Sequence, residues 1–180
     1  MNEVINFVQL VDTVGNPIGI MDKIEAHRSS TLHRAVSVLV FNSSGKWLLH
    51  RRAITKYHSG GLWTNACCTH PFPGEDYAEA ARRRLQEEMG ILTKDQFIHL
   101  MDFVYQAKVN NELTEYEYDR VFTLISDDLP EPHPDEVDEW KYLSTEELLK
   151  EIKHHPEHFT EWFKLFFQQP AIIEMLKTNN

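Results

Sequence analysis

The chain has few of the residues that mark secreted or membrane proteins. It contains only two cysteines in 180 residues, Cys67 and Cys68, and neighbouring cysteines seldom form a disulfide because the ring they close is strained. We therefore expect a reduced, cytoplasmic protein. No apolar run approaches the roughly 18 residues of a membrane span, and residues 1–10 lack the basic segment of a signal peptide. We expect no membrane partner.

Positive charge is also scarce. Eighteen Lys and Arg face 28 Asp and Glu, which gives a net charge of −10 and argues against general nucleic-acid binding. The sequence contains no internal repeat, long linker or low-complexity tract. We expect a single domain over residues 1–180, present as a monomer or weak homodimer.

The remaining pattern predicts an α+β fold in which a mixed sheet is flanked by helices. The predicted strands cover residues 4–11, 34–41, 46–52, 63–68, 98–109, 114–125 and 137–143. The clearest helix is capped by Asp76, runs to Met89 and ends at Gly90. A capping box at residues 144–147 opens a second helix to about His154. Two further helices, 159–167 and 171–177, are separated by Pro170.

Two short motifs carry the chemistry. Cys68 and His70 are two residues apart, so both side chains point to one face of an extended segment. Glu115 and Glu117 have the same spacing in a strand-like run. A thiol, an imidazole and two carboxylates indicate a metal site beside a site of proton transfer.

A third motif lies at the end of the long predicted helix. Glu87-Glu88-Met89-Gly90-Ile91 resembles the tail of the Nudix box, and Glu75 fits the early glutamate of that box. The match is degenerate, because Thr69 replaces the first glycine and Arg84 replaces a glutamate that hydrolases use. Taken alone, two glutamates at a helix end are more often a solvated surface.

The motifs occur in an order that resembles type I isopentenyl diphosphate isomerase, a Nudix-like family. The specific element is Trp63-Thr64-Asn65 followed by Cys68-Thr69-His70-Pro71. The resemblance covers the chain from about Asp22 to Trp162. It implies reversible conversion of isopentenyl diphosphate to dimethylallyl diphosphate through a tertiary carbocation.

The resemblance also implies a set of site residues. One divalent metal, Mn²⁺, Mg²⁺ or Zn²⁺, would be bound by His27, His33, His70, Glu115 and Glu117. A Mg²⁺ ion that arrives with the substrate would be bound by Glu88 and the Cys68 carbonyl. The candidate cations for the diphosphate are Lys23, Arg51, Arg52, Lys56 and Arg84, and the resemblance matches all of these except Arg51.

Four side chains are implied in the reaction itself. Cys68 and Glu117 would carry protons, Tyr105 would hydrogen-bond the glutamate, and Trp162 would face the alkyl end of the substrate. Without the resemblance, Tyr105 and Trp162 would equally be ordinary packing residues, and His27 or His33 alone would be a surface histidine. The remaining histidines are interpreted as solvent or packing residues: His50, His58, His99, His133, His154, His155 and His158.

Two other functions are compatible with parts of the pattern. A Nudix hydrolase would use Glu87 and Glu88 to hold Mg²⁺ and activate water. A non-catalytic Nudix-like module would only bind a diphosphate. The substitution at Arg84 disfavours the first, and the complete acid–base and metal sets disfavour the second.

Overall fold

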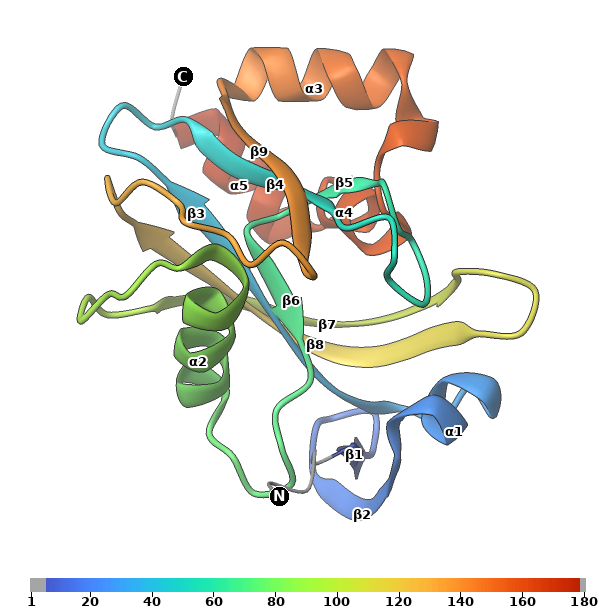
Figure 1. Cartoon of the computed structure of the whole chain (residues 1–180). Helices are drawn as coiled ribbons and strands as arrows, with labels where there is room; N and C mark the ends of the chain where they lie inside the picture. The colour runs from blue at the N-terminus through green and yellow to red at the C-terminus, as the bar shows by residue number, and fades with distance from the viewer. Residues whose placement is uncertain (1–5, 179–180) are drawn as a thin grey trace.

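The computed structural model describes residues 6–178 and forms a curled, mixed sheet with helices on both sides (Figure 1). The strands are β1 (Phe7–Val11), β2 (Pro17–Asp22), β3 (His33–Phe41), β4 (Trp47–Arg52), β5 (Trp63–Thr64), β6 (Cys67–Thr69), β7 (Ile98–Lys108), β8 (Thr114–Ile125) and β9 (Val137–Leu143). The helices are α1 (Lys23–Arg28), α2 (Tyr77–Met89), α3 (Thr145–His154), α4 (Glu161–Phe166) and α5 (Pro170–Thr178), with a 3₁₀ turn at Pro156–His158. The predicted α+β class is confirmed.

Strand β3 is the centre of the sheet and sets the geometry of the site. It pairs antiparallel with β6 and parallel with β8, so that Ser37 lies opposite Cys68 and His33 lies opposite Glu117. Its almost continuous apolar sequence is typical of a strand that is buried on both faces. The strand therefore brings the Cys68 and Glu117 segments to its two sides.

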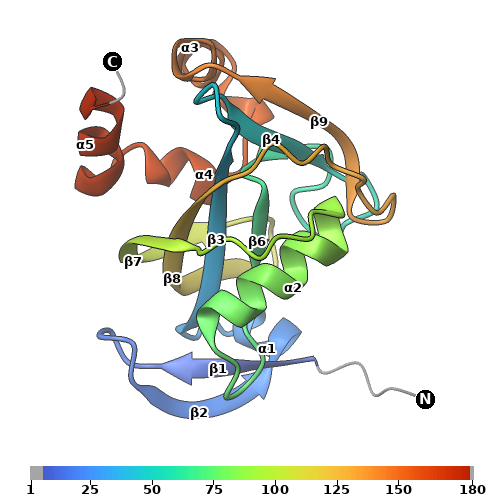
Figure 2. The same cartoon turned by 90° about the vertical axis from the view of Figure 1, so that its left-hand side faces the viewer.

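Alternation along β3 divides the apolar core into two clusters. Val36, Val38 and Val40 pack with Leu85 of α2, whereas Leu39 belongs to a second cluster that contains α4. Figure 2 shows α2 and the α4–α5 pair on opposite sides of β3.

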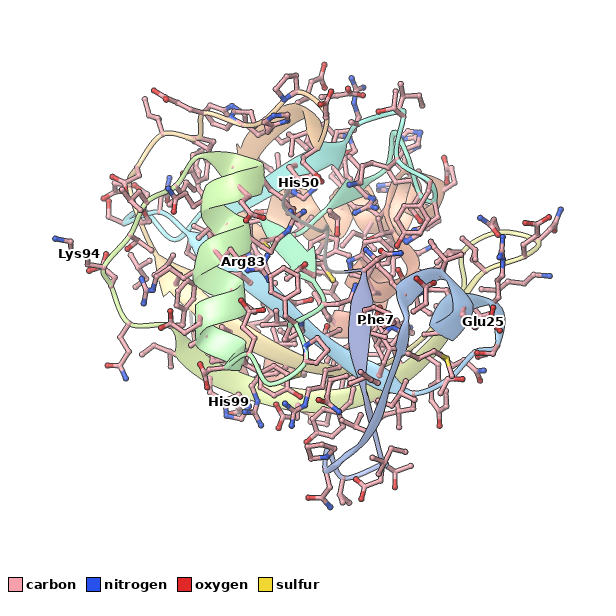
Figure 3. All side chains as sticks on the ribbon, turned by 60° about the horizontal axis from the view of Figure 1, so that its bottom comes forward. Phe7, Glu25, His50, Arg83, Lys94 and His99 are labelled. Atoms are coloured by element: carbon pink, nitrogen blue, oxygen red, sulfur yellow. The ribbon has the colours of Figure 1, made fainter. Side chains whose placement is uncertain are left out.

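Helix α2 begins and ends where the sequence predicts. The Asp76 carboxylate accepts hydrogen bonds from the backbone N–H groups of Ala78 and Glu79. Gly90 ends the helix in the left-handed conformation, with φ of 69°, which glycine adopts without steric cost. Arg83 projects from this helix in Figure 3.

Two predicted strand assignments differ from the structure. The segment 63–68 forms two short strands, because the Asn65 side chain donates to the carbonyls of Val38 and Cys67 between them. The hairpin of β3 and β4 pairs only next to its turn, at Val40 with Leu48 and Phe41 with Trp47. Beyond that point β6 replaces β4 as the neighbour of β3.

The ends of the chain also depart from the prediction. Pro170 is the first residue of α5 rather than a separator, because proline fits the first turn of a helix, where its missing N–H is not needed. Helix α4 starts only at Glu161, since Phe159 still bridges to Trp63. Strand β2 and helix α1 were not predicted, and residues 4–5 of the first predicted strand lie outside the described residues. Among the described helices, none has the length and apolar character needed to cross a membrane.

Candidate active site

An open pocket is lined by residues of β6, β8, α2 and α4. Ten of the predicted site residues line it: Lys23, Arg52, Lys56, Cys68, His70, Arg84, Glu88, Glu115, Glu117 and Trp162. The other three contact these residues: His27 at the Lys23 carbonyl, and His33 and Tyr105 at the Glu117 carboxylate. Residues that are distant in sequence are therefore brought together at one place.

Three imidazoles and a carboxylate form a compact cluster at the back of the pocket. Donor atoms of His27, His33, His70 and Glu117 all lie within 4.8 Å of one another. Helix α1 carries His27, β3 begins at His33, and His70 follows β6. The unpredicted helix α1 is therefore the element that brings His27 to the site.

The hydrogen bonds of the rings leave nitrogen atoms directed at the centre of this cluster. Nδ1 of His27 is 2.7 Å from the Lys23 carbonyl, and Nδ1 of His33 is 2.7 Å from the Thr31 carbonyl. A carbonyl only accepts, so each Nδ1 carries hydrogen and each Nε2 presents a lone pair. Within residues 6–178 neither Nε2 has a hydrogen-bond partner. Buried Nε2 lone pairs with a carbonyl-fixed Nδ1 are the usual arrangement of histidine metal ligands, and the residues fit a divalent ion.

Glu115, the fifth predicted ligand, lies next to this cluster. The Tyr105 hydroxyl donates to Glu117 at 2.6 Å and approaches Glu115 at 3.1 Å, so it holds the two carboxylates side by side. Donor atoms of Glu115, His27 and His58 make a second group within 4.8 Å. The predicted contact between Tyr105 and the glutamate is present.

His58 was interpreted as a solvent or packing residue, but it lines the pocket. Its Nε2 is 3.5 Å from Glu115 Oε1, and its ring meets Trp162 edge-on at 6.1 Å between centroids. It lies in the loop between β4 and β5, where there is no periodicity to predict which way a side chain points. Tyr57 and Glu136 also line the pocket and were missed for the same reason.

The surroundings of Glu115 and Glu117 shift their pKa values in opposite directions. Burial raises the pKa of Glu115 well above the usual value, and the nearby charge of Glu117 adds to this. Burial acts on Glu117 in the same direction, but the facing imidazoles of His33 and His70 hold its pKa well below the usual value. His70 Nε2 lies 2.9 Å from Glu117 Oε1. Paired titratable groups whose environments drive their pKa values apart are typical of acid–base sites.

Cys68 presents its thiol to the pocket. Burial and the negative charges of Asp119 and Glu117 raise its pKa well above the usual value. The group is therefore a protonated thiol at neutral pH, which is the form of a proton donor. Its neighbour Cys67 is fully buried in the cluster under α2.

A group of cations lines another part of the pocket. Burial lowers the pKa of Lys23, and the charges of Lys56, Arg84 and Arg52 lower it further. Glu136 offsets part of this charge, because Lys56 Nζ lies 2.6 Å and Arg84 Nη2 lies 3.3 Å from its Oε2. One buried and three half-buried cations that repel one another form a site for an anion such as a diphosphate.

Arg84 and Glu88 connect the cations to helix α2. Arg84 donates to Glu88 Oε1 through Nε at 3.1 Å and Nη2 at 2.5 Å. Glu87 is exposed and Glu75 pairs with Arg83 at 2.8 Å, so neither lines the pocket formed by the described residues. Only one of the two glutamates required by the hydrolase alternative reaches the pocket.

Trp162 is 1% exposed and lines the pocket from α4. The Arg52 guanidinium lies over its ring, with Cζ 5.4 Å from the centroid. The ring therefore already contacts a cation through its π-face, which carries the negative end of the ring quadrupole.

The fold and the site define a Nudix protein, since the NUDIX domain model matches residues 31–163. A crystal structure from Deinococcus radiodurans is similar, with a TM-score of 0.69 and 24% identity, over 83% of this chain and 90% of that one. The MutT protein of Methanosarcina mazei Go1 has a TM-score of 0.61 and 20% identity, over 76% and 91%. These identities show the fold alone.

Curated relatives narrow the class to one family. The isopentenyl-diphosphate Delta-isomerase of Pectobacterium atrosepticum is 45% identical, over 89% of this chain and 88% of the relative. The protein of the same name from Serratia proteamaculans is 42% identical, over 92% of each. The chain belongs to the isopentenyl-diphosphate Delta-isomerase family, as the sequence motifs predict.

Proposed function

We propose that this protein interconverts isopentenyl diphosphate and dimethylallyl diphosphate. The observation that carries the proposal is the placement of Cys68 and Glu117. They lie on the strands that flank β3 on either side, and both side chains line the same pocket. The family membership of the protein and this pair of proton carriers point to the same reaction.

The reaction needs two proton carriers, because a proton is added at one carbon of the alkyl chain and removed at another. An unactivated alkene is a very weak base, so the acid has to be held close to it and the cation has to be stabilised. Cys68 and Glu117 exchange these protons from two sides of the substrate. Tyr105 holds the Glu117 carboxylate in place through its 2.6 Å hydrogen bond.

A divalent metal is proposed at the five side chains His27, His33, His70, Glu115 and Glu117. This set of nitrogen and oxygen donors suits Mn²⁺, Mg²⁺ or Zn²⁺. When bound, the ion supplies positive charge that fixes the carboxylates and tunes their acidity. A separate Mg²⁺ is proposed to accompany the diphosphate at Glu88 and the Cys68 carbonyl.

The cation group binds the polar end of the substrate in this proposal. Arg52 and Arg84 offer forked donors to the phosphate oxygens, and Lys23 and Lys56 supply point charges. Trp162 then faces the alkyl end, where its ring stabilises the developing carbocation and excludes water that would convert the cation to an alcohol.

We further propose that residues 1–180 act as one cytoplasmic domain, as a monomer or weak homodimer. The single pair of adjacent cysteines and the absence of linkers in the sequence support this proposal. The net negative charge disfavours a nucleic-acid partner.

One experiment tests the reaction against hydrolysis. The purified protein is incubated with isopentenyl diphosphate and Mg²⁺ in D₂O. We expect the allylic isomer, with deuterium bound to carbon in the alkyl skeleton. Accumulation of inorganic phosphate or pyrophosphate without carbon-bound deuterium would show that the protein is a hydrolase, and neither product would indicate a binding module.

A further inference from the structure

Asp119 is a buried carboxyl group with no part in the reaction as proposed. It follows Glu115 and Glu117 by the two-residue period of β8, so the three side chains share one face of the strand. Its side chain is fully buried, and its Oδ2 accepts a hydrogen bond from Ser37 Oγ at 2.8 Å. Its Oδ1 is without a hydrogen-bond partner among the described residues. A buried carboxyl group of this kind is costly and calls for a role.

Ser37 connects Asp119 to the thiol of Cys68. Ser37 lies directly opposite Cys68 in the antiparallel pair of β3 and β6, so both side chains project to the same face. The Ser37 hydroxyl donates to Asp119, and the Ser37 side chain faces that of Cys68 across the strand pair. The three residues lie on the neighbouring strands β6, β3 and β8.

We propose that Ser37 and Asp119 are positioning residues that hold the Cys68 thiol in one orientation toward the substrate. A cysteine side chain has a single χ angle to its sulfur, so one fixed hydrogen-bond partner is sufficient to select a rotamer. Ser37 is that partner, and Asp119 fixes the rotamer of Ser37 from the other side. A hydroxyl has one hydrogen, which Ser37 donates to Asp119, so Ser37 can only accept from the Cys68 thiol.

This inference rests on the proposed reaction, but it can be tested without it. The parent protein carries Cys67→Ala, so that Cys68 is the only thiol and its S–H stretching band can be measured by infrared spectroscopy. In the parent we expect a band shifted by hydrogen bonding. Ser37→Ala should move the band to the position of a free thiol, and Ser37→Thr should restore it because threonine keeps the hydroxyl and suits a strand.

Turnover gives the second readout. Ser37→Ala should lower kcat on the order of 10-fold, because a misplaced catalytic group is a less effective one, while KM for isopentenyl diphosphate changes little. Ser37→Thr should recover most of the kcat. The proposal would be overturned if a folded Ser37→Ala protein kept the S–H band at the parent's position and had a parent-like kcat.

Asp119 is tested by a matched pair that stays informative if Ser37→Ala does not fold. Asp119→Asn keeps a hydrogen-bonding partner for Ser37 and should retain the band and most of the kcat. Asp119→Val removes the partner with a side chain that suits a buried strand, and it should lose both. Equal kcat in the two variants would assign Asp119 a structural role only. A parent protein that does not isomerise the substrate would contradict the proposed function, whereas the infrared comparison would still test the pair.

Discussion

Cys67 and Cys68 are consecutive residues of β6, and their side chains lie on opposite sides of it. Cys67 is 0% exposed and packs in the apolar cluster under α2 with Leu85. Cys68 is half-buried, lines the pocket and contacts the second cluster on the α4 side. The alternation of a strand thus gives two chemically identical groups different surroundings.

These two cysteines provide a matched pair of variants. Cys68→Ala should lower kcat by about 100-fold or more, because it removes a proton carrier. Cys67→Ala should leave kcat almost unchanged and lower the free energy of unfolding by about 1 kcal/mol, as small losses of core contacts do. Steady-state kinetics and chemical denaturation measure the two effects. Similar kcat values in both variants, at equal folded content, would contradict the assignment of the thiol.

The position of Cys68 could be predicted because its signal is local. The Cys-x-His spacing selects one cysteine from two, and a strand period then directs it to the same side as His70. Glu115 and Glu117 could be predicted for the same reason. His58 could not be predicted, because it lies in a loop, which has no period. Its partner Glu115 also belongs to a strand that is distant in sequence.

The sheet shows the same division between local and distant signals. Strand β3 and helix α2 have clear patterns, so their bounds were predicted within a residue or two. The exchange of β4 for β6 beside β3 depends on where Asn65 finds backbone partners, and the parallel pairing of β3 with β8 joins distant segments. Neither of these pairings leaves a periodic pattern in its own segment.

Arg51 and Arg52 supply a second matched pair on β4. Arg52 is buried and lines the pocket, whereas Arg51 pairs with Glu139 at 3.3 Å on the surface. Arg52→Gln should raise KM for isopentenyl diphosphate by about 10- to 100-fold, the value of a hydrogen bond to a charged group. Arg51→Gln should change KM by less than about 3-fold, as surface ion pairs contribute little. Equal effects of the two substitutions on KM would show that Arg52 does not bind the phosphate.

Metal content tests the cluster of histidines and glutamates. His70→Asn and Glu115→Gln should each weaken binding of Mn²⁺ by roughly 10-fold or more, measured by equilibrium dialysis. The exposed His99 offers a control, and His99→Asn should bind the ion normally. Binding should also weaken in acid, because protons compete for the imidazole nitrogens. Full occupancy in a His27, His33 and His70 triple variant would refute this site.

His50 should make the fold sensitive to acid. Its imidazole is 1% exposed, and burial together with the charge of Arg52 lowers its pKa to about 3. At pH values between the ordinary histidine pKa of about 6.5 and this lowered pKa, only the unfolded chain binds the proton. The free energy of unfolding should therefore fall as the pH is lowered through this range, by up to about 1.4 kcal/mol per pH unit.

Replacing the imidazole should flatten this dependence. In His50→Asn the side-chain amide can still donate to the Ala66 carbonyl, which Nδ1 approaches at 3.2 Å, but it does not titrate. Urea unfolding between pH 4.5 and 7.5, with a chelator present, should give a shallower slope than the parent protein. His99→Asn is the exposed control, and a slope equal to that control would exclude His50 as the cause.

Trp162 gives the sharpest test of a carbocation. An ammonium diphosphate with nitrogen at the position of the tertiary carbon should bind much more tightly than the substrate, because it resembles the transition state. The ring is buried and already lies against the Arg52 guanidinium, so its π-face can stabilise a cation by on the order of 2 kcal/mol. Trp162→Ala should then weaken the ammonium compound about 30-fold more than it weakens isopentenyl diphosphate. Trp162→Phe keeps a π-face and should lose only part of this difference. Inhibition constants for the ammonium compound and dissociation constants for the substrate give the comparison. If the alanine variant weakens both ligands by the same factor, Trp162 fills space in the pocket and does not stabilise charge.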